Sequence, residues 1–413
     1  GGHSRLLPST LCLAGVCLWG ERLLPSALFP GRRRPASAPV GRRSAMSSLE
    51  SWRISRTELR ELLLKYERAV EDDAYFLLQP SKAERALLGD DLIRRRAEAV
   101  RKARATNRQF IDLVLEDLPD ICAGPDSVVD PVRPVAEFRC LGEGTPTLPA
   151  SSYGSMASVF LHLLRDWSTD CEHVCTSTYG PAVKELRELL PNRGNVLVPG
   201  AGLGRLALAL AADGFSVEAN DASRLFLTFA DYVLNRAPAE GMPLFPMAHV
   251  FSENWSHERG QYVQVQVPLP AAAQLGAAGG SPPRITFVPG DFAKTYGRGQ
   301  AGHRRFDAIV TCFFVDTAAD VQELFSVMDG LLEEGGVWIN VGPLNWRKEA
   351  RLKLSWDEIV SIWERLGYDF VVQKHTQVDY HLSQGVKMYT ESYDCALTAA
   401  VKRRAGTAAP AAA

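Results

Sequence analysis

The fold is decided by residues 196–205, which read VLVPGAGLGR. The first residues form an apolar run of the kind that fills a buried strand, and the glycines that follow turn the chain into a helix. Glycine lets a backbone approach a ligand where a Cβ would clash, and a helix N-terminus offers free N–H groups and the positive end of a dipole. The loop therefore predicts a ligand site with Gly200, Gly202 and Gly204 as candidate contacts. Its G-x-G-x-G spacing is neither the G-x-G-x-x-G dinucleotide fingerprint nor a P-loop.

Strands and helices alternate on both sides of this loop. An apolar stripe at helical spacing precedes it, and short β-rich runs separated by helical stretches follow it. The sequence predicts strands at residues 194–198, 215–219, 285–288, 306–310 and 336–341, and helices at 155–167, 205–212, 224–234, 319–333 and 355–366. Such alternation is typical of βαβ units, so we expect an α/β fold with a doubly wound, mostly parallel sheet and helices on both faces.

The first 45 residues differ from the rest of the chain in composition. They hold seven arginines against a single acid, Glu21, and they are rich in Ser and Pro, which is typical of a transit peptide. The chain starts with Gly1, and its first methionine, Met46, directly precedes a helical pattern. Three interpretations therefore stay open for residues 1–45: a translated leader or gene-model artefact, an organelle-targeting segment, and a functional basic arm. We exclude these residues from the fold.

Three further segments complete the predicted organisation. Residues 46–150 form an N-terminal module of two to three helices, followed by a linker spotted with Pro and Gly. Residues 151–403 form the α/β domain, which residues 257–283, rich in Pro, Gly and Ala, interrupt as a long insertion. The Ala-rich tail, residues 404–413, is expected to be loose and flexible.

Composition narrows the class of protein. Of the 413 residues, 46% are apolar, which is enough for a sizeable core, and the net charge of −2 argues against a nucleic-acid-binding chain. The longest early apolar run, residues 11–19, is too short for a membrane span. Eight scattered cysteines fit free thiols in a reducing compartment, so we expect a cytoplasmic protein, with the nucleus as an additional location. Cys171 and Cys175 lack the second half of a zinc site, so no metal is predicted. The composition leaves a homodimer open.

An acid stands at the end of the second strand of the α/β pattern. Asp221 follows Gly200 by 21 residues, just after the strand at 215–219. In a doubly wound sheet an acid there faces the ligand crevice and can accept hydrogen bonds from ribose hydroxyls. Taken alone, it is also compatible with a helix N-cap. Together with the glycine loop, it indicates a ligand that contains a nucleoside.

Two more strand ends carry polar and aromatic groups. Asp291 and Phe292 follow the strand at 285–288, where the carboxylate can accept from the amino group of an adenine and the ring can pack on it. A turn with a core Phe is the alternative. The next strand ends in TCFFVD, residues 311–316. Because the carboxyl ends of parallel strands face the crevice, Asp316 is placed to meet a substrate.

In this order the motifs resemble those of class I S-adenosylmethionine-dependent methyltransferases, and most specifically those of the carnosine N-methyltransferase (N2227-like) family. Members of that family show a helix ending in RDWS (here residues 165–168), then PGAGLGRLA (199–207), CFF-hydrophobic-DTA (312–318) and WIN-x-GPL (338–344). The resemblance spans roughly residues 90–403. It implies a Rossmann-like class I methyltransferase fold.

The resemblance also implies an S-adenosylmethionine site built from each of these motifs. Its residues would be His162, Arg165, Gly200, Asp221, Asp291, Phe292 and Cys312. Arg165 would take the methionine carboxylate in a bidentate pair. In family members close to the human enzyme, Gln stands at the position of His162.

The implied reaction is methyl transfer to a ring nitrogen of a histidine-containing dipeptide, giving anserine from carnosine. Asp316 would hydrogen-bond the imidazole and hold its tautomer, which leaves the other ring nitrogen aimed at the methyl group. Phe313, Arg347, Tyr389 and Tyr393 would join it as substrate contacts. Asp316 and Tyr393 would be the catalytic residues.

Two departures from the family pattern concern the substrate. After GPL the family has a Leu-Tyr-His run, whereas this chain has Asn345-Trp346-Arg347, so Arg347 stands where a substrate-contacting His would. An Arg there would favour a carboxylate or phosphate on the substrate, or point outward. The family's adjacent C-terminal tyrosines are reduced to Tyr389 and Tyr393.

Other functions remain open at this point. The acceptor can be another small molecule or a protein histidine, and the fold can also serve as a catalytically inactive binding protein. An NAD-dependent oxidoreductase fits less well, because the glycine spacing differs from the dinucleotide fingerprint.

Overall fold

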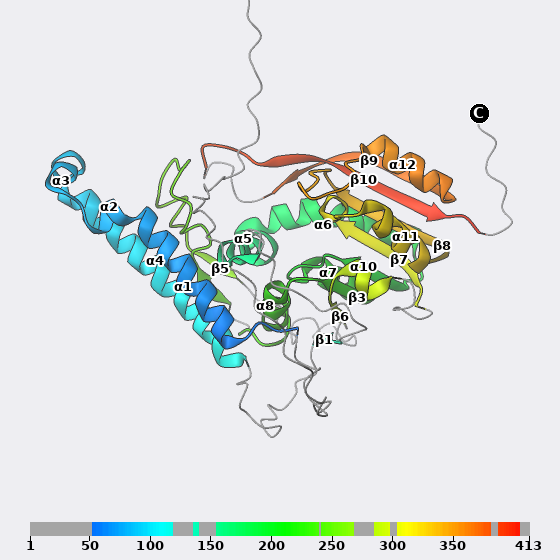
Figure 1. Cartoon of the computed structure of the whole chain (residues 1–413), viewed down its shortest axis with the longest axis horizontal. Helices are drawn as coiled ribbons and strands as arrows, with labels where there is room; N and C mark the ends of the chain where they lie inside the picture. The colour runs from blue at the N-terminus through cyan, green and yellow to red at the C-terminus, as the bar shows by residue number, and fades with distance from the viewer. Residues whose placement is uncertain are drawn as a thin grey trace, which may run out of the picture. The chain divides into compact units, whose positions relative to one another are not determined.

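The structure is a computed structural model of the chain (Figure 1). It describes residues 52–118, 135–139, 154–238, 241–267, 285–297, 304–380 and 387–404. Residues 1–45, most of the linker between 124 and 150, the larger part of the predicted insertion and the tail after residue 404 lie outside the described residues.

Helices and strands alternate through most of the described chain. The helices are α1 (Arg56–Asp73), α2 (Tyr75–Leu78), α3 (Lys82–Leu88), α4 (Asp90–Asp117), α5 (Met156–Trp167), α6 (Glu172–Leu189), α7 (Arg205–Ala212), α8 (Arg224–Asn235), α10 (Phe292–Tyr296), α11 (Val321–Leu331) and α12 (Trp356–Arg365), with 3-10 turns η2 (Thr169–Cys171) and η3 (Val315–Thr317). The strands are β1 (Ala136–Phe138), β2 (Asn195–Pro199), β3 (Ser216–Asp221), β4 (Met242–Leu244), β5 (Val265–Val267), β6 (Ile285–Pro289), β7 (Phe306–Cys312), β8 (Leu332–Gly342), β9 (Tyr368–Asp379) and β10 (Ser392–Lys402).

Eight of these strands form one sheet, in the order β1-β6-β3-β2-β7-β8-β10-β9. Within this sheet, neighbours among β1, β6, β3, β2, β7 and β8 pair in parallel. β10 pairs antiparallel with both β8 and β9. From β2 the chain moves outward to β3 and β6, and it then crosses back to β7 on the other side of β2. This reversal is a topological switch point, where open α/β sheets bind their ligands. The expected α/β Rossmann-like fold with a mostly parallel sheet is confirmed.

Apolar side chains on alternate positions of the strands build a core on each face of the sheet. Val196 and Val198 of β2 pack with residues of α5, α6, α7 and α8, while Leu197 between them packs with residues of α10, α11 and α12. On the second face, Trp338 of β8 stacks on Trp363 of α12 with ring centroids 4.3 Å apart. Both faces of the sheet are covered, as the continuous apolar run of β2 requires.

Residues 52–118, the described part of the N-terminal module, contain four helical segments, where the sequence predicted two to three helices. The two long ones, α1 and α4, run side by side (Figure 1). Asn107 of α4 joins them to the α/β domain: its side chain accepts from the Phe245 backbone N–H at 2.8 Å and donates to the Phe245 carbonyl at 2.9 Å. A second link is the ion pair between Arg53 and Asp231, at 2.8 Å.

Several elements were not predicted. They include β1, α6, the β4–β5 pair, α10 and the antiparallel strands β9 and β10. α6 contains Pro181 inside the helix, which masks its helical pattern. β5 lies within the predicted insertion, so that segment is not a loop throughout. None of the helices within the described ranges has both the length and the apolar character needed to cross a bilayer.

We expect Asn107→Ala to lower the free energy of unfolding by about 3 kcal/mol, because it removes both hydrogen bonds to the Phe245 backbone and leaves the buried Phe245 N–H without a partner. Urea unfolding followed by circular dichroism measures this. Gln109→Ala, an exposed change on the same helix, is the control and should stay within about 0.5 kcal/mol of wild type. Equal stabilities of the two variants would contradict the role of Asn107.

Candidate active site

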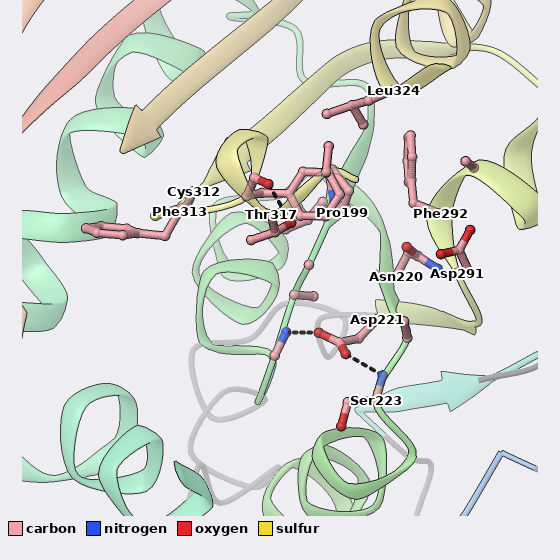
Figure 2. Close-up of a pocket in the computed structure, with 18 of the residues that line it drawn as sticks. Pro199, Asn220, Asp221, Ser223, Asp291, Phe292, Cys312, Phe313, Thr317 and Leu324 are labelled. Atoms are coloured by element: carbon pink, nitrogen blue, oxygen red, sulfur yellow. Dashed lines mark hydrogen bonds between the residues drawn. The ribbon is translucent and has the colours of Figure 1, made fainter. Parts of the chain in front are cut away.

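A cavity of about 600 Å³ lies at the carboxyl ends of β2, β3, β6 and β7 (Figure 2). Its walls come from the loops that follow these strands, from α5 and from the end of β9. Ten of the predicted site residues line it: His162, Arg165, Gly200, Gly202, Asp221, Asp291, Phe292, Cys312, Phe313 and Arg347. Residues predicted from six separate stretches of sequence are therefore brought to one cavity at the switch point.

The glycine loop after β2 forms one wall. Gly200 and Gly202 have φ values of 65° and 55°, in the left-handed region that favours glycine. A Cβ on Gly200 would lie 2.5 Å from the Phe314 ring, closer than side-chain atoms pack. The loop can therefore keep this shape only with glycine at position 200.

Gly204 is a correction to the predicted site. It does not line the cavity, and a Cβ there would lie 2.9 Å from Leu234 and 3.1 Å from Phe287. Its role is to let α7 approach α8 and β6 closely. The third glycine of the motif serves helix packing instead of ligand contact.

Asp221 is buried at the end of β3 and accepts two backbone hydrogen bonds. Its Oδ2 accepts from Gly202 N–H at 2.9 Å and its Oδ1 from Ser223 N–H at 2.8 Å; Figure 2 shows both as dashed lines. Burial raises the pKa of this carboxyl, while the backbone N–H groups and the charge of Arg347 oppose that rise. The side chain thus fixes the glycine loop and also borders the cavity.

Arg165 lies in the last turn of helix α5 and lines the cavity, and its guanidinium pairs with Asp166. Nε donates to Asp166 Oδ1 at 2.7 Å and Nη2 to Asp166 Oδ2 at 3.1 Å. The ring of Tyr380 lies 5.2 Å from the guanidinium carbon. The sequence predicted that this bidentate edge would take the methionine carboxylate; in the structure Asp166 occupies it, so an incoming anion would have to meet Nη1.

His162, Asp291 and Phe292 also have defined local partners. Nδ1 of His162 lies 2.8 Å from the Ser158 carbonyl, which only accepts, so this ring nitrogen carries the proton. Asp291 caps α10 by accepting from the Lys294 N–H at 3.1 Å. Phe292 is buried, and Figure 2 draws it next to Asp291. The acid and the aromatic ring therefore lie together on one side of the cavity, as predicted.

The end of β7 supplies Cys312 and Phe313. Burial raises the pKa of the Cys312 thiol, so it stays protonated and unreactive at neutral pH. Phe313 has a φ of 49°, and a Cβ on Gly342 of β8 would lie 3.1 Å from its backbone nitrogen. This strained backbone turns the Phe313 ring to the opposite side of the cavity from Phe292 in Figure 2.

Asp316 lies in the η3 turn. The residue is buried, with 7% exposure, and its Oδ2 accepts from the Asn345 N–H at 2.8 Å. Burial raises the pKa of Asp316 to about 6, and the Asn345 N–H and the charge of Arg347 act in the opposite direction. Thr317, the next residue, and Arg347 both line the cavity, whereas Asp316 itself does not.

The two predicted tyrosines behave differently. Tyr393 packs its ring against Phe313 and Tyr380, with centroids 5.7 Å and 5.5 Å away, and its hydroxyl donates to Glu391 at 2.8 Å. Burial raises the pKa of its hydroxyl further above neutrality. Tyr389 is 37% exposed and does not line the cavity. Tyr393 therefore supports the cavity wall from behind, and Tyr389 lies away from it.

Sequence analysis missed three aromatic residues of the cavity: Tyr179, Phe314 and Tyr380. Phe314 lies inside the quoted TCFFVD motif and meets Phe292 edge-on at 5.8 Å. Tyr380 directly follows β9, whose first residues, YDFVV (368–372), are rich in aromatic and β-branched side chains that could have signalled a strand. Within the described residues, no cluster of three or more His, Cys, Asp or Glu could hold a metal ion.

Comparisons with known proteins identify the family. The family described as "Carnosine N-methyltransferase" matches residues 148–404, a later start than the residue 90 expected from the motifs. The Mus musculus protein of that name is 31% identical over 265 residues, which cover 60% of this chain and 64% of the mouse protein. The Schizosaccharomyces pombe protein of that name is 29% identical over 245 residues, covering 54% and 64%.

The match thus covers just under two thirds of these relatives' own length. Among solved structures, a magnesium protoporphyrin IX methyltransferase from Synechocystis aligns over 60% of this chain and 93% of its own at 13% identity, with a TM-score of 0.36. The family match covers more than half of this chain, including every strand of the α/β sheet except β1. This chain belongs to the carnosine N-methyltransferase family of S-adenosylmethionine-dependent methyltransferases.

Proposed function

We propose that this chain is an N-methyltransferase that moves a methyl group from S-adenosylmethionine to an imidazole nitrogen of a histidine-containing dipeptide, forming anserine from carnosine. The observation that carries the proposal is the buried carboxylate of Asp316, directly before Thr317, which lines a cavity with candidate partners for each part of the cofactor. Family membership supports the same reaction.

The cavity walls fit S-adenosylmethionine from end to end. A carboxylate offers about four acceptor positions, so Asp221 keeps capacity for ribose hydroxyls beyond its two backbone bonds. Asp291 and Phe292 are suited to the adenine, by an acceptor for its amino group and a ring against its face. Arg165 provides a cation for the methionine carboxylate.

When bound, S-adenosylmethionine supplies an electrophilic methyl group on a sulfonium sulfur. The chain's own residues then have to align an unprotonated ring nitrogen with that methyl group. An ionised Asp316 accepts the N–H of the imidazole, which leaves the lone pair on the other nitrogen. Phe313 and Tyr380, whose ring centroids lie 5.3 Å apart, give the flat substrate ring an aromatic wall.

The charge of Arg347 indicates that the substrate carries a negatively charged group. Arg347 is exposed, lines the cavity, and its charge opposes the rise in the pKa of both Asp221 and Asp316. Guanidinium pairs with carboxylates in fork geometry. We therefore infer that a dipeptide with a free carboxylate is preferred over an uncharged imidazole.

The setting of the proposed enzyme follows from the same observations. The acceptor is a small molecule, because the cavity is bounded by side chains from several loops and holds about 600 Å³. The cysteines that the structure describes, Cys171, Cys175, Cys312 and Cys395, are free thiols. This supports work in a reducing compartment such as the cytoplasm.

Methyl-labelled S-adenosylmethionine tests the reaction. We expect label in carnosine and homocarnosine, with less in histamine, which has no carboxylate for Arg347. Product masses identify the acceptor. Label found only in another component of a cell extract would keep the methyltransferase and overturn the carnosine assignment. No label in any acceptor would favour a catalytically inactive binding protein.

We expect Asp221→Asn to weaken S-adenosylmethionine binding about tenfold or more, because the amide has one oxygen in place of two. Isothermal titration calorimetry measures the dissociation constant. Asp307→Asn is a matched control: Asp307 accepts the Asn195 N–H at 2.8 Å at the opposite end of the sheet. Unchanged cofactor affinity in Asp221→Asn would show that the ribose lies elsewhere.

The pH profile of kcat/KM tests Asp316. Its carboxyl must be ionised to accept the imidazole N–H, so activity falls as the pH drops through about 6. The substrate imidazole, with a pKa of about 6.5, must also be unprotonated. We therefore expect log kcat/KM to fall with a slope of about two below both values in the wild type, and about one in Asp316→Asn. A slope of one in both proteins would show that kcat/KM does not depend on the ionisation of Asp316.

A further inference from the structure

The strongest unexplained feature beside the cavity is a buried ion pair with its own hydrogen-bond network. Arg165 and Asp166 are neighbours in the last turn of α5, with side chains only 13% and 3% exposed. Arg165 lines the cavity, while Asp166 does not and lies behind it. A pair this deeply buried loses the hydration of both charges, so its presence beside a binding site calls for a reason.

A second helix completes the network. The hydroxyl of Tyr179, on α6, donates to Asp166 Oδ1 at 2.9 Å and accepts from Arg165 Nη2 at 3.4 Å. Asp166 thus receives three hydrogen bonds on its two oxygens, from Arg165 Nε, Arg165 Nη2 and the tyrosine. None of these bonds uses Nη1 of the arginine. Tyr380 covers the guanidinium from β9.

The electrostatics keep both partners charged. Burial alone works against the charge of Arg165, yet the adjacent Asp166 raises its pKa well above the usual value. Burial likewise opposes ionisation of Asp166, and Arg165 overcomes this and lowers the pKa of the carboxyl. Arg165 therefore stays positively charged at the cavity wall around neutral pH.

We propose that Asp166 and Tyr179 are positioning residues of the cofactor site, which hold the guanidinium of Arg165 so that its Nη1 edge meets the carboxylate of the methionine moiety. This proposal rests on the proposed cofactor, but it does not depend on which acceptor is methylated. An arginine on an unconstrained side chain would lose rotamer entropy on binding an anion. The network removes that loss before the ligand arrives.

The network also limits which anion can bind. Because Nε and Nη2 already donate to Asp166, Arg165 cannot give an anion the parallel pair of hydrogen bonds from these two nitrogens. Nη1 is the nitrogen that remains for the ligand. The net charge of the pair is zero, which suits the zwitterionic end of an amino acid better than a multiply charged phosphate. The ligand class that this corner of the cavity takes is therefore an α-amino acid.

Tyr179→Phe is the decisive variant, because it removes one hydroxyl and leaves the ring in place. Tyr368→Phe is its matched control: Tyr368 is buried and donates to the Asp329 carboxylate at 3.0 Å, and it does not line the cavity. Both variants lose one buried tyrosine–carboxylate hydrogen bond. Calorimetry on the full chain measures the dissociation constants of S-adenosylmethionine and of S-adenosylhomocysteine, and thermal unfolding measures stability without ligand.

We expect Tyr179→Phe to weaken both ligands about fivefold, the equilibrium equivalent of one hydrogen bond, while kcat at saturating cofactor stays within about twofold of wild type. Adenosine, which lacks the amino-acid end, should bind Tyr179→Phe and wild type equally. Tyr368→Phe should melt at a lower temperature with cofactor affinity unchanged. Asp166→Asn, a second variant that keeps the shape, should weaken cofactor binding more than Tyr179→Phe does.

Two results would overturn the proposal. One is a Tyr179→Phe variant that binds S-adenosylmethionine as tightly as the wild type. The other is an equal loss of adenosine affinity, which would mean a general disturbance of the cavity. A wild-type chain that binds no S-adenosylmethionine would overturn the cofactor assignment as well, whereas tight binding without carnosine methylation would leave this inference intact and remove only the proposed acceptor.

Discussion

Two backbone N–H groups converge on one buried carboxylate at the carboxyl edge of the sheet. Gly202 belongs to the loop after β2 and Ser223 to the turn after β3, and both donate to Asp221. One side chain thus ties together the ends of two neighbouring strands. Because an unpaired buried carboxylate is costly, the glycine loop has to adopt its cradle shape for Asp221 to be satisfied. The cavity at the switch point depends on this constraint.

The position of helix α7 is the second condition for that cavity. Gly204 lets the helix approach Leu234 and Phe287 more closely than any side chain would allow. The N-terminus of α7 therefore starts at the glycine loop and faces the crevice, where its free N–H groups favour an anionic or polar ligand. The close packing at Gly204 thus positions the N–H groups at the start of α7 beside the cavity.

The proposed acceptor side of the cavity is built by another part of the chain. The antiparallel strands β9 and β10 extend the sheet beyond β8 and bring Tyr380 and Tyr393 against Phe313. The loop after β8 supplies the Asn345 N–H that holds Asp316. Parallel strands thus carry the residues proposed to hold the cofactor. The C-terminal strands carry the aromatic residues beside the proposed acceptor position.

The sequence by itself determined the parallel half of the sheet, the glycine loop and Asp221, because these follow from local periodicity and from turn chemistry within a few residues. Only the tertiary structure decided that Gly204 packs helix α7, that Asp166 occupies the fork of Arg165, and that Tyr380 lines the cavity while Tyr389 lies outside it. Each of these depends on partners distant in the chain or on the pairing register of β9 with β10. A shift of one residue in that register would turn every side chain of the strand to the other face, and no local pattern fixes it.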